Sequence, residues 1–305
     1  MAQGPYHIVL QAYGHEGILQ ECLFVLFSFA KMHPEAEQQQ VSFHIYTDKP
    51  DWFRQFKDCP LDLHFHEITP TLLTQWRGEI NFVHRVKIEV LRDFTRQQKG
   101  TVLYLDTDVY FTQSIFPTLQ RIEKGALFMH VSEGHLDNEA TPMMAKLHRF
   151  FRKQNTFQVG DKKETIPLDT VMWNAGVLGF HTDMAVVLDD VLALTDTVHR
   201  LFPKHIVEQF AFSYFFAKNG HIHNSAGSIV HYWILSEVKV VLGSFFEFFK
   251  GKSWQELLKY SELVQHTVLV QEKTSFFINR SVMGKIRQLR WDPAIPDWVA
   301  LLKQM

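Results

Sequence analysis

Two carboxylates follow the most strand-like run of the sequence. Residues 101–105 form a short continuous apolar run of the kind found in central parallel strands, and Asp106 and Asp108 come directly after it. Ligands of open α/β sheets bind outside the carboxyl ends of the strands. Two acids this close repel each other unless a cation lies between them, and Mg²⁺ and Mn²⁺ prefer such oxygen ligands, commonly together with a substrate phosphate. The pair therefore predicts a metal site for a diphosphate, with an ordinary acidic turn as the alternative.

Alternating strand-like and helical segments surround this pair. Short apolar runs predict strands at 7–11, 41–46, 61–66, 101–105, 126–131 and 177–180, and apolar residues at helical spacing predict helices at 18–29, 80–94, 143–151, 183–199 and 206–218. This alternation predicts an α/β fold with a mostly parallel sheet. His64 and His66 share one face of an expected strand, and we expect two solvated histidines because no third metal ligand lies nearby in the sequence.

The pattern changes near residue 231. Residues 238–249 are very apolar, Ser253 and Glu256 have the spacing of a capping box, and the chain is again helical after Pro296. We therefore expect a catalytic domain over residues 1–235 and a smaller, mainly helical appendage over 236–305. Between 273 and 291 the charged residues are all basic, which predicts either a solvated basic face or a surface for anionic lipid or substrate.

The composition excludes several classes of protein. The 305 residues suffice for two domains or one large one, at the usual ~150 residues per domain. Lys and Arg number 31 against 33 for Asp and Glu, so the net charge of −2 provides no overall field for nucleic acid, which we do not expect as a partner. Two cysteines cannot build a disulfide framework or a thiolate zinc site. Without a secretory signal or a spanning apolar window, we expect a cytoplasmic protein, with peripheral contact to the inner face of the membrane through 273–291.

Four further segments accompany the Asp-x-Asp strand in a fixed order. They are Arg85-Val86-Lys87, Trp173-Asn174-Ala175-Gly176-Val177, Glu208-Gln209 and Val230-His231-Tyr232. Together with residues 102–109 they resemble the GT-A glycosyltransferases, most closely the family 8 type that includes bacterial lipooligosaccharide galactosyltransferases and glycogenin. The resemblance implies a GT-A fold, with a Rossmann-like nucleotide-diphospho-sugar transferase domain.

The same resemblance implies a metal-dependent hexosyltransferase that takes a sugar from a UDP-sugar and retains its anomeric configuration. The acceptor would be a carbohydrate or a lipid-linked glycan. Asp106, Asp108 and His231 would hold Mn²⁺ or Mg²⁺ against the donor diphosphate. Gln209 would lie beside the anomeric carbon, and Glu208 would bind sugar hydroxyls. The implied donor-binding residues are Ala12, Tyr13, Arg85, Lys87, Asp106, Thr107, Asn174, Ala175 and Gly176.

The chain departs from the family pattern in three places, one of which is Glu208, where relatives carry the shorter Asp. Ala12-Tyr13-Gly14 stands where relatives carry acidic residues that recognise uracil, and here Tyr13 would stack on the base. After His231 the sequence lacks the family's Gly-x-x-Lys-Pro-Trp, so that Lys239 is only a nearby candidate for contacting phosphate.

Two alternatives remain open. The haloacid dehalogenase-like phosphatases also place Asp-x-Asp after an apolar strand, which would make Asp106 the nucleophile and Asp108 the general acid of a Mg²⁺-dependent phosphatase. That pattern has Thr or Val where this chain has Tyr110, and it leaves the segments at 174 and 231 unexplained. The other alternative is a protein that binds a nucleotide-sugar or carbohydrate without catalysis.

Overall fold

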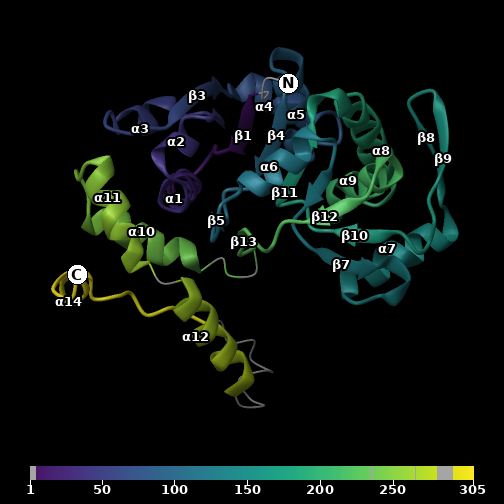
Figure 1. Ribbon diagram of the computed structural model, residues 1–305. Helices are drawn as coiled ribbons and strands as arrows, with labels where there is room; N and C mark the ends of the chain where they lie inside the picture. Colours follow the sequence, from purple (N-terminus) through teal and green to yellow (C-terminus); the bar gives the residue numbers. More distant parts are fainter. Residues whose placement is uncertain (1–4, 234, 236, 265, 280–290) are drawn as a thin grey trace.

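A seven-stranded sheet forms the centre of the molecule in the computed structural model, which describes residues 5–233, 235, 237–264, 266–279 and 291–305 (Figure 1). The strand order is β12-β6-β11-β4-β1-β2-β3. All neighbours are parallel except β11, which runs antiparallel to both β4 and β6. The predicted α/β class with a mostly parallel sheet is therefore confirmed. The strands are β1 (Tyr6–Gln11), β2 (Val41–Thr47), β3 (Asp62–Glu67), β4 (Thr101–Leu105), β6 (Leu127–Met129), β11 (Val177–His181) and β12 (Ile222–Asn224).

Three two-stranded ribbons and the helices complete the described chain. The ribbons pair β5 (Val109–Phe111) with β13 (Ile229–His231), β7 (Ser132–His135) with β10 (Val171–Trp173), and β8 (Thr156–Val159) with β9 (Lys162–Thr165). The α-helices are α1 (Glu16–Met32), α2 (Glu35–Gln38), α3 (Pro50–Arg54), α4 (Pro70–Arg77), α5 (Arg85–Gln97), α6 (Phe116–Glu123), α7 (Pro142–Lys153), α8 (Val187–Leu201), α9 (Ile206–Asn219), α10 (Val238–Phe248), α11 (Trp254–Tyr260), α12 (His266–Asn279) and α14 (Trp298–Leu302). Short 3-10 turns span Leu136–Asn138, Thr182–Met184 and Ser261–Leu263.

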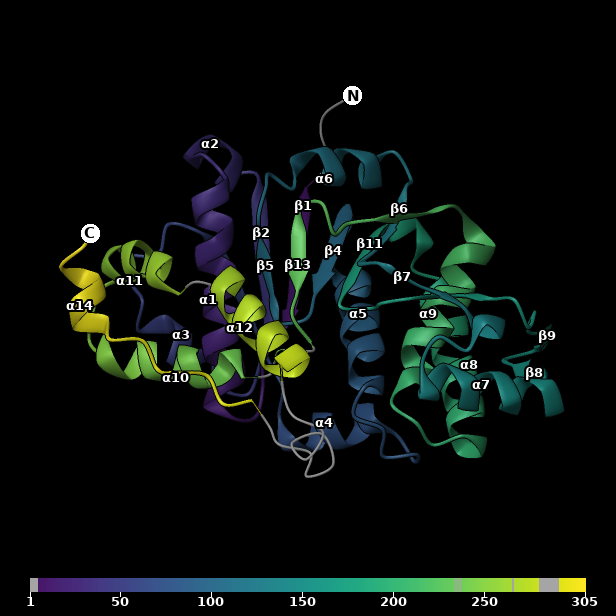
Figure 2. The same ribbon diagram turned by 90° about the horizontal axis from the view of Figure 1, so that it is seen from below.

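Helices cover the sheet on both faces (Figure 2). Successive side chains of a strand point to opposite faces, and all of β4 is buried. Leu103 and Leu105 of β4 pack into a core with α1, α6 and the C-terminal helices, whereas Val102 and Tyr104 pack into a second core with α5, α7, α8 and α9. The buried run that precedes the two aspartates is thus held from both sides.

The helix that carries Lys87 begins later than the sequence predicts. The expected helix started at residue 80, but α5 starts at Arg85. Asn81 has φ of 45°, in the left-handed region, which interrupts any helix at that point. Val83, expected on the buried face, is consequently outside the helix and 45% exposed.

The C-terminal helices share a core with α1. Val241, Leu242 and Phe245 of α10 belong to the same buried cluster as the apolar side chains of α1, and Phe27 of α1 packs against Trp254 at 4.7 Å between ring centroids. The predicted capping box of Ser253 and Glu256 is present at the start of α11. The division into residues 1–235 and 236–305 stays a prediction. No helix among the described residues has the length and apolar character needed to span a membrane.

Histidines of three neighbouring strands form a chain of contacts at the sheet edge. Nδ1 of His7 lies 3.1 Å from Nε2 of His44, whose Nδ1 lies 3.0 Å from Nε2 of His66, and the His64 ring stacks on His44. The expectation of solvated histidines is confirmed for the exposed His64, whereas His66 is half-buried. Burial, together with the neighbouring rings, lowers the pKa of His44 to about 3.

This histidine chain makes the free energy of unfolding depend on pH. The unfolded state protonates His44 near its ordinary pKa of 6.5, whereas the folded state does so near 3. The unfolded state therefore binds more protons in this interval, and His44 destabilises the fold progressively as the pH falls from about 6.5 towards 3. We expect His44→Phe to lose stability less steeply than the wild type over this range, as measured by urea unfolding at several pH values.

The test compares the pH dependence of the variant with that of the wild type. Buried carboxyl groups with raised pKa values, such as Glu21 and Glu208, change the free energy of unfolding with pH in the opposite direction, and their contribution cancels in this difference. His221→Gln, at an exposed histidine, is the control and should follow the wild type. Parallel stability curves for His44→Phe and wild type would contradict the assignment.

Candidate functional site

The carboxyl edge of the central sheet gathers the predicted site segments. β1 and β4 are parallel neighbours that end in register, so the loop at Ala12 and the segment at Asp106 leave the sheet side by side. The backbone N–H of Asp106 donates to the carbonyl of Gly176 at 2.9 Å. Asp106 therefore lies where the first loop and the segment before β11 meet.

A short ribbon brings the predicted metal histidine to the aspartates. β5 begins directly after Asp108 and pairs with β13, which places His231 opposite Val109. The N–H of Tyr232 donates to the carbonyl of Asp108 at 2.9 Å. One ligand atom from each of Asp106, Asp108 and His231 lies within 4.8 Å of the others. The structure thus brings the three expected metal ligands together.

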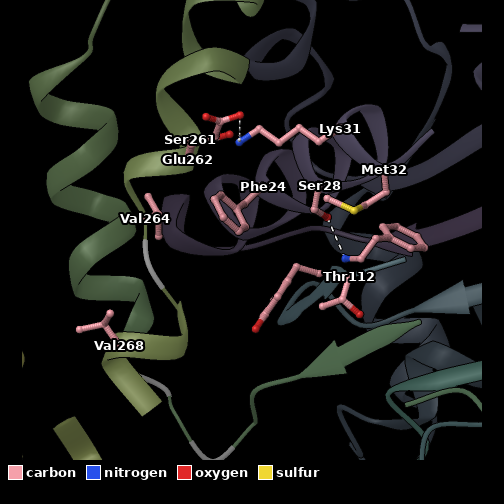
Figure 3. Close-up of a pocket in the computed structure, with 11 residues that line it drawn as sticks. Phe24, Ser28, Lys31, Met32, Thr112, Ser261, Glu262, Val264 and Val268 are labelled. Atoms are coloured by element: carbon pink, nitrogen blue, oxygen red, sulfur yellow. Dashed lines mark hydrogen bonds and ion pairs between the residues drawn. The ribbon is translucent and has the colours of Figure 1, made fainter. Parts of the chain in front are cut away.

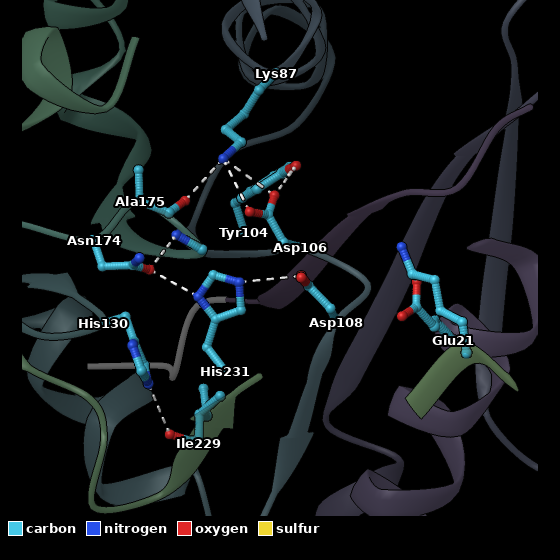
Figure 4. A network of polar contacts seen from close by, with 12 residues as sticks. Glu21, Lys87, Tyr104, Asp106, Asp108, His130, Asn174, Ala175, Ile229 and His231 are labelled. Atoms are coloured by element: carbon cyan, nitrogen blue, oxygen red, sulfur yellow. Dashed lines mark hydrogen bonds and ion pairs between the residues drawn. The ribbon is translucent and has the colours of Figure 1, made fainter. Parts of the chain in front are cut away.

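Asn174 orients the ring of His231 (Figure 4). Its Oδ1 accepts from the Gly176 N–H at 3.0 Å and lies 2.8 Å from Nδ1 of His231. Because an amide oxygen only accepts, Nδ1 carries the hydrogen, which leaves Nε2 of the neutral ring as an acceptor. Nε2 faces Oδ1 of Asp108 at 3.1 Å. Two acceptors that face each other need a proton or a cation between them, so the arrangement fits a bound metal ion.

The set of donor atoms suits a hard divalent cation. Carboxylate oxygens and an imidazole nitrogen are ligands that Mn²⁺ and Mg²⁺ accept. Burial alone would raise the pKa of Asp108, but a hydrogen bond from a proton on Nε2 of His231, in the absence of a cation, lowers this pKa below the usual value. The side chains of Asp106 and Asp108 are 28% and 26% exposed. The cluster is therefore charged and open on one side to a ligand.

Lys87 lies behind Asp106, inside the protein. Its Nζ is 3.1 Å from Oδ1 of Asp106 and 3.3 Å from Oε1 of Glu208, and it donates to the carbonyl of Ala175 at 3.0 Å. Burial alone would lower the pKa of Lys87, but the two carboxylates raise it above its usual value. Tyr104 also donates to Asp106, at 2.9 Å. Lys87 and Tyr104 together fix the Asp106 carboxylate from the protein side.

The two residues expected to act on the donor sugar lie in the first turns of α9. Glu208 is 2% exposed and faces Lys87, and burial raises its pKa to about 7. Gln209 donates to Glu133 at 2.9 Å, and the other oxygen of Glu133 accepts from Asn174 at 3.1 Å. Glu208 is thus bonded inward, whereas Gln209 is connected through Glu133 to the residue that orients His231.

The remaining donor-binding candidates differ in their positions. The N–H of Ala12 donates to the carbonyl of Tyr46 at 2.8 Å. Burial raises the pKa of Tyr13. Tyr13 lies close enough to Tyr104 to contribute to the raised pKa of Tyr104. Thr107, between the two aspartates, is 8% exposed. Residues 12–13 therefore lie beside the cluster.

Arg85 is held away from the cluster. Its guanidinium donates to Asp196 at 2.8 Å, to Glu89 at 2.8 Å and to the carbonyl of Trp76 at 2.7 Å. The side chain is 11% exposed. A donor contact by Arg85 would require these bonds to break, so Arg85 is bound on α5 and α8 rather than brought together with Lys87.

A second cation stands near the cluster. Figure 4 shows Glu21 of α1 on the side of Asp108 opposite to His231. Glu21 is 1% exposed, and its Oε2 lies 3.4 Å from Nζ of Lys239 in the first turn of α10. Burial raises the pKa of Glu21 to about 7, and Lys239 opposes this rise. Lys239 also helps to lower the pKa of Asp108, so its charge acts on the cluster.

Sequence reasoning missed Glu133, Tyr104 and Glu21. Tyr104 could have been found, because it precedes Asp106 by two residues and so points to the same side of the strand. Glu21 was signalled by a single acid within the apolar stretch of the first helix. Glu133 carries no local signal, since its partners are 41 and 76 residues away along the chain.

Gly176→Ala tests the position of His231. A Cβ built on Gly176 would overlap the imidazole ring of His231 and displace it from Asp108. We expect Mn²⁺ affinity, measured by isothermal titration calorimetry, to fall about 10- to 100-fold, as for the loss of other groups that orient a metal ligand. Gly227→Ala is the matched control, because a Cβ there meets nothing within 4 Å. Unchanged Mn²⁺ affinity in Gly176→Ala would exclude His231 as a ligand.

Lys87→Met tests how much the buried ion pairs of Lys87 contribute to the free energy of unfolding. Removal of the ammonium leaves Asp106 and Glu208 uncompensated, so we expect a loss of about 3–5 kcal/mol in the free energy of unfolding. Adding Glu208→Gln should restore part of it. Lys218→Met removes a lysine that is 49% exposed in its pair with Glu164, and it should cost no more than about 1 kcal/mol. Equal costs for the two single variants, by urea unfolding, would contradict this account.

No protein-family model and no curated protein sequence matches the chain. Among solved structures it is similar to the apo form of mouse xyloside xylosyltransferase 1, with 13% identity over 72% of this chain and 84% of that chain and a TM-score of 0.48. It is also similar to galactosyltransferase LgtC in complex with donor and acceptor sugar analogues, with 15% identity over 68% of this chain and 70% of that chain and a TM-score of 0.46. Glycosyltransferase GlyE of Streptococcus pneumoniae shows 12% identity over 90% of this chain and 64% of that chain, with a TM-score of 0.46. These structures are glycosyltransferases, the class that the sequence motifs resemble. All three similarities are distant, so the function is argued from the residues of this chain.

Proposed function

We propose that this chain is a metal-dependent glycosyltransferase that uses a nucleotide-sugar donor. The observation that carries the proposal is the cluster of Asp106, Asp108 and His231 at the carboxyl edge of the central sheet, oriented by Asn174 and open on one side. A cluster of this kind binds a divalent cation together with a diphosphate. The donor diphosphate is the ligand that such a site would take from a nucleotide-sugar.

Different residues would hold the metal ion, orient its ligands and bind the donor. Asp106, Asp108 and His231 would hold Mn²⁺ or Mg²⁺, which supplies a Lewis acid that neutralises the charge of the departing nucleoside diphosphate. Lys87 keeps the Asp106 carboxylate in a fixed orientation. Lys239 would bind the anionic donor from the other side, since its charge already acts on Asp108. Preorganised charges of this kind stabilise the transition state without moving during the reaction.

The sugar is expected beside the segment that links the metal ligands. Asn174, Ala175 and Gly176 would line its pocket, and Gln209, which Glu133 connects to Asn174, would lie beside the anomeric carbon. A hexose as the transferred sugar, uridine as the base and retention of configuration are proposed from the family resemblance. Tyr13, beside the cluster, would stack on the base.

A lipid-linked glycan is the acceptor that we propose, with the protein acting at the cytoplasmic face of a membrane. The basic stretch at 273–291 is the proposed membrane contact. Four of its five basic residues fall within 280–290, outside the described residues, and the fifth, Lys273, is paired with Glu237 at 2.7 Å. This contact therefore stays a prediction.

Asp108→Asn and His231→Ala should each lower donor turnover at least ~10²-fold, because each removes charge stabilisation from the transition state. Turnover is measured as Mn²⁺-dependent release of nucleoside diphosphate. His148→Ala, which removes a histidine from its pair with Glu139, is the matched control and should retain wild-type turnover. Full activity of both metal-ligand variants, with Mn²⁺ still required, would refute the ligand assignment.

A thermal-shift panel of UDP-, GDP-, CDP- and dTDP-sugars, with and without Mn²⁺, tests donor and metal together. A ligand that binds the native state at 100 times its Kd adds ~2.7 kcal/mol of stability. We expect stabilisation by a UDP-sugar that requires Mn²⁺ and is absent in Asp108→Asn. Turnover of a generic phosphomonoester with Mg²⁺, abolished by Asp106→Asn, would instead support a phosphatase. Donor binding without turnover would support a binding protein.

A further inference from the structure

An open pocket lies between the catalytic part of the chain and its C-terminal helices (Figure 3). Its volume is about 690 Å³, within the range of ~300–1,000 Å³ typical of small-molecule sites. One wall is formed by α1, a second by β5 and Thr112, and a third by Ser261, Glu262, Val264 and Val268. None of the residues that line it belongs to the metal cluster.

The walls of this pocket are mainly apolar. Phe24 and Met32 come from α1, Tyr110 comes from β5, and Val264 and Val268 come from the C-terminal segment. Ser28 also lines the pocket, but its hydroxyl donates to the carbonyl of Val25 at 2.8 Å and accepts from the N–H of Phe111 at 3.0 Å. The hydroxyl is thus bonded to the backbone, and the ligand that fits these walls is a hydrocarbon.

A charged pair lies at one end of the pocket. Lys31 and Glu262 approach to 3.9 Å, with 20% and 65% of their side chains exposed, and Figure 3 shows Val268 toward the other end. Burial lowers the pKa of Lys31 to about 8. A pocket with apolar walls and charge at one end suits an amphipathic molecule better than a wholly apolar one.

Large apolar side chains that are exposed are more frequent in the C-terminal part of the described chain than elsewhere. Among the described residues, those that lie before residue 236 are Met32, Val83, Val186, Leu201 and Trp233. The others are Val240, Phe248, Val268, Val270, Ile278, Ile295, Val299 and Met305. Met32 and Val268 also line the pocket, so exposed apolar surface extends to its walls.

The pocket is connected to the metal cluster by one short ribbon. Asp108 precedes β5, and Tyr110, Phe111 and Thr112 at its other end line the pocket. The partner strand β13 ends in His231. At ~3.3 Å per residue, the cluster and the pocket wall are about 10 Å apart along β5. A single amphipathic molecule can therefore reach both.

We propose that this pocket binds the hydrocarbon chain of the acceptor, so that the sugar end of a lipid-linked or alkyl-linked glycan reaches the metal cluster. Chain binding is a property of the pocket alone, and the role of the bound molecule as acceptor rests on the function proposed above.

Binding of the fluorescent fatty acid 11-(dansylamino)undecanoic acid tests the pocket directly. We expect saturable binding to the full chain, with displacement by octanoic, decanoic and dodecanoic acids below their micellar concentrations. Competitor affinity should rise about fourfold per added methylene, the increment for burying each CH₂ group. Val268→Trp fills the pocket and should weaken probe binding at least tenfold. Val270→Trp is the matched control, because this valine lies on the same helix with 44% exposure against 40% but does not line the pocket.

The outcomes separate chain binding from the proposed activity. Absence of saturable probe binding, or equal loss in Val268→Trp and Val270→Trp, overturns the pocket assignment, whatever the donor panel shows. Failure of the donor panel with intact probe binding overturns the proposed function instead. For an enzyme that turns over its donor, dodecyl glycosides of glucose, galactose and mannose are compared with their methyl counterparts. A KM at least tenfold lower for the dodecyl compound supports the acceptor role, provided that this difference disappears in Val268→Trp and remains in Val270→Trp. Equal KM values, or no use of any dodecyl glycoside, overturn the acceptor role.

Discussion

The site depends on the buried ion pairs of the Lys87 ammonium with Asp106 and Glu208. An uncompensated charge in the interior is costly, so Lys87 requires Asp106 and Glu208 as partners, and these carboxylates require Lys87. The three side chains come from α5, the end of β4 and α9, and their mutual attraction fixes these elements relative to one another. Asp106 is thereby oriented before any ligand binds, with a carboxylate oxygen within 4.8 Å of ligand atoms of Asp108 and His231.

Local patterns in the sequence predicted six of the seven strands of the sheet and the pair of Asp106 and Asp108, whereas His231 followed from the family resemblance. The run before Asp106 was recognisable because a central strand is buried on both faces and reads as continuously apolar. Two expectations were not fully met, in places where a single residue or a distant partner decided the outcome. Asn81 in the left-handed region delays α5, and the contact with His44 of the neighbouring strand leaves His66 half-buried. Contacts such as that of Glu133 with Gln209 join residues far apart in sequence and leave no periodic signal.

The apolar composition of α1 explains why the C-terminal helices pack against it. Residues 21–30 of α1 are all buried, although a helix on the surface of a sheet normally keeps one polar face. A helix that is apolar all round must be covered on its second side, and α10 and α11 provide that cover. The apolar run in the first helix and the apolar run at 238–249 therefore belong together. The pocket at this boundary exists because the cover is incomplete between Met32 and Val268.

Asn174 contacts both the metal-ligand candidate His231 and the side chain that leads to the proposed sugar pocket. Its side chain orients the metal ligand His231, while through Glu133 it is connected to Gln209, the residue proposed to face the transferred sugar. Under the proposed function, a substitution of Asn174 that reshapes the sugar pocket would also change the tautomer or the direction of the imidazole. Donor preference and metal affinity would then be coupled at Asn174, and changes of sugar specificity that preserve activity would have to arise at other positions of the pocket.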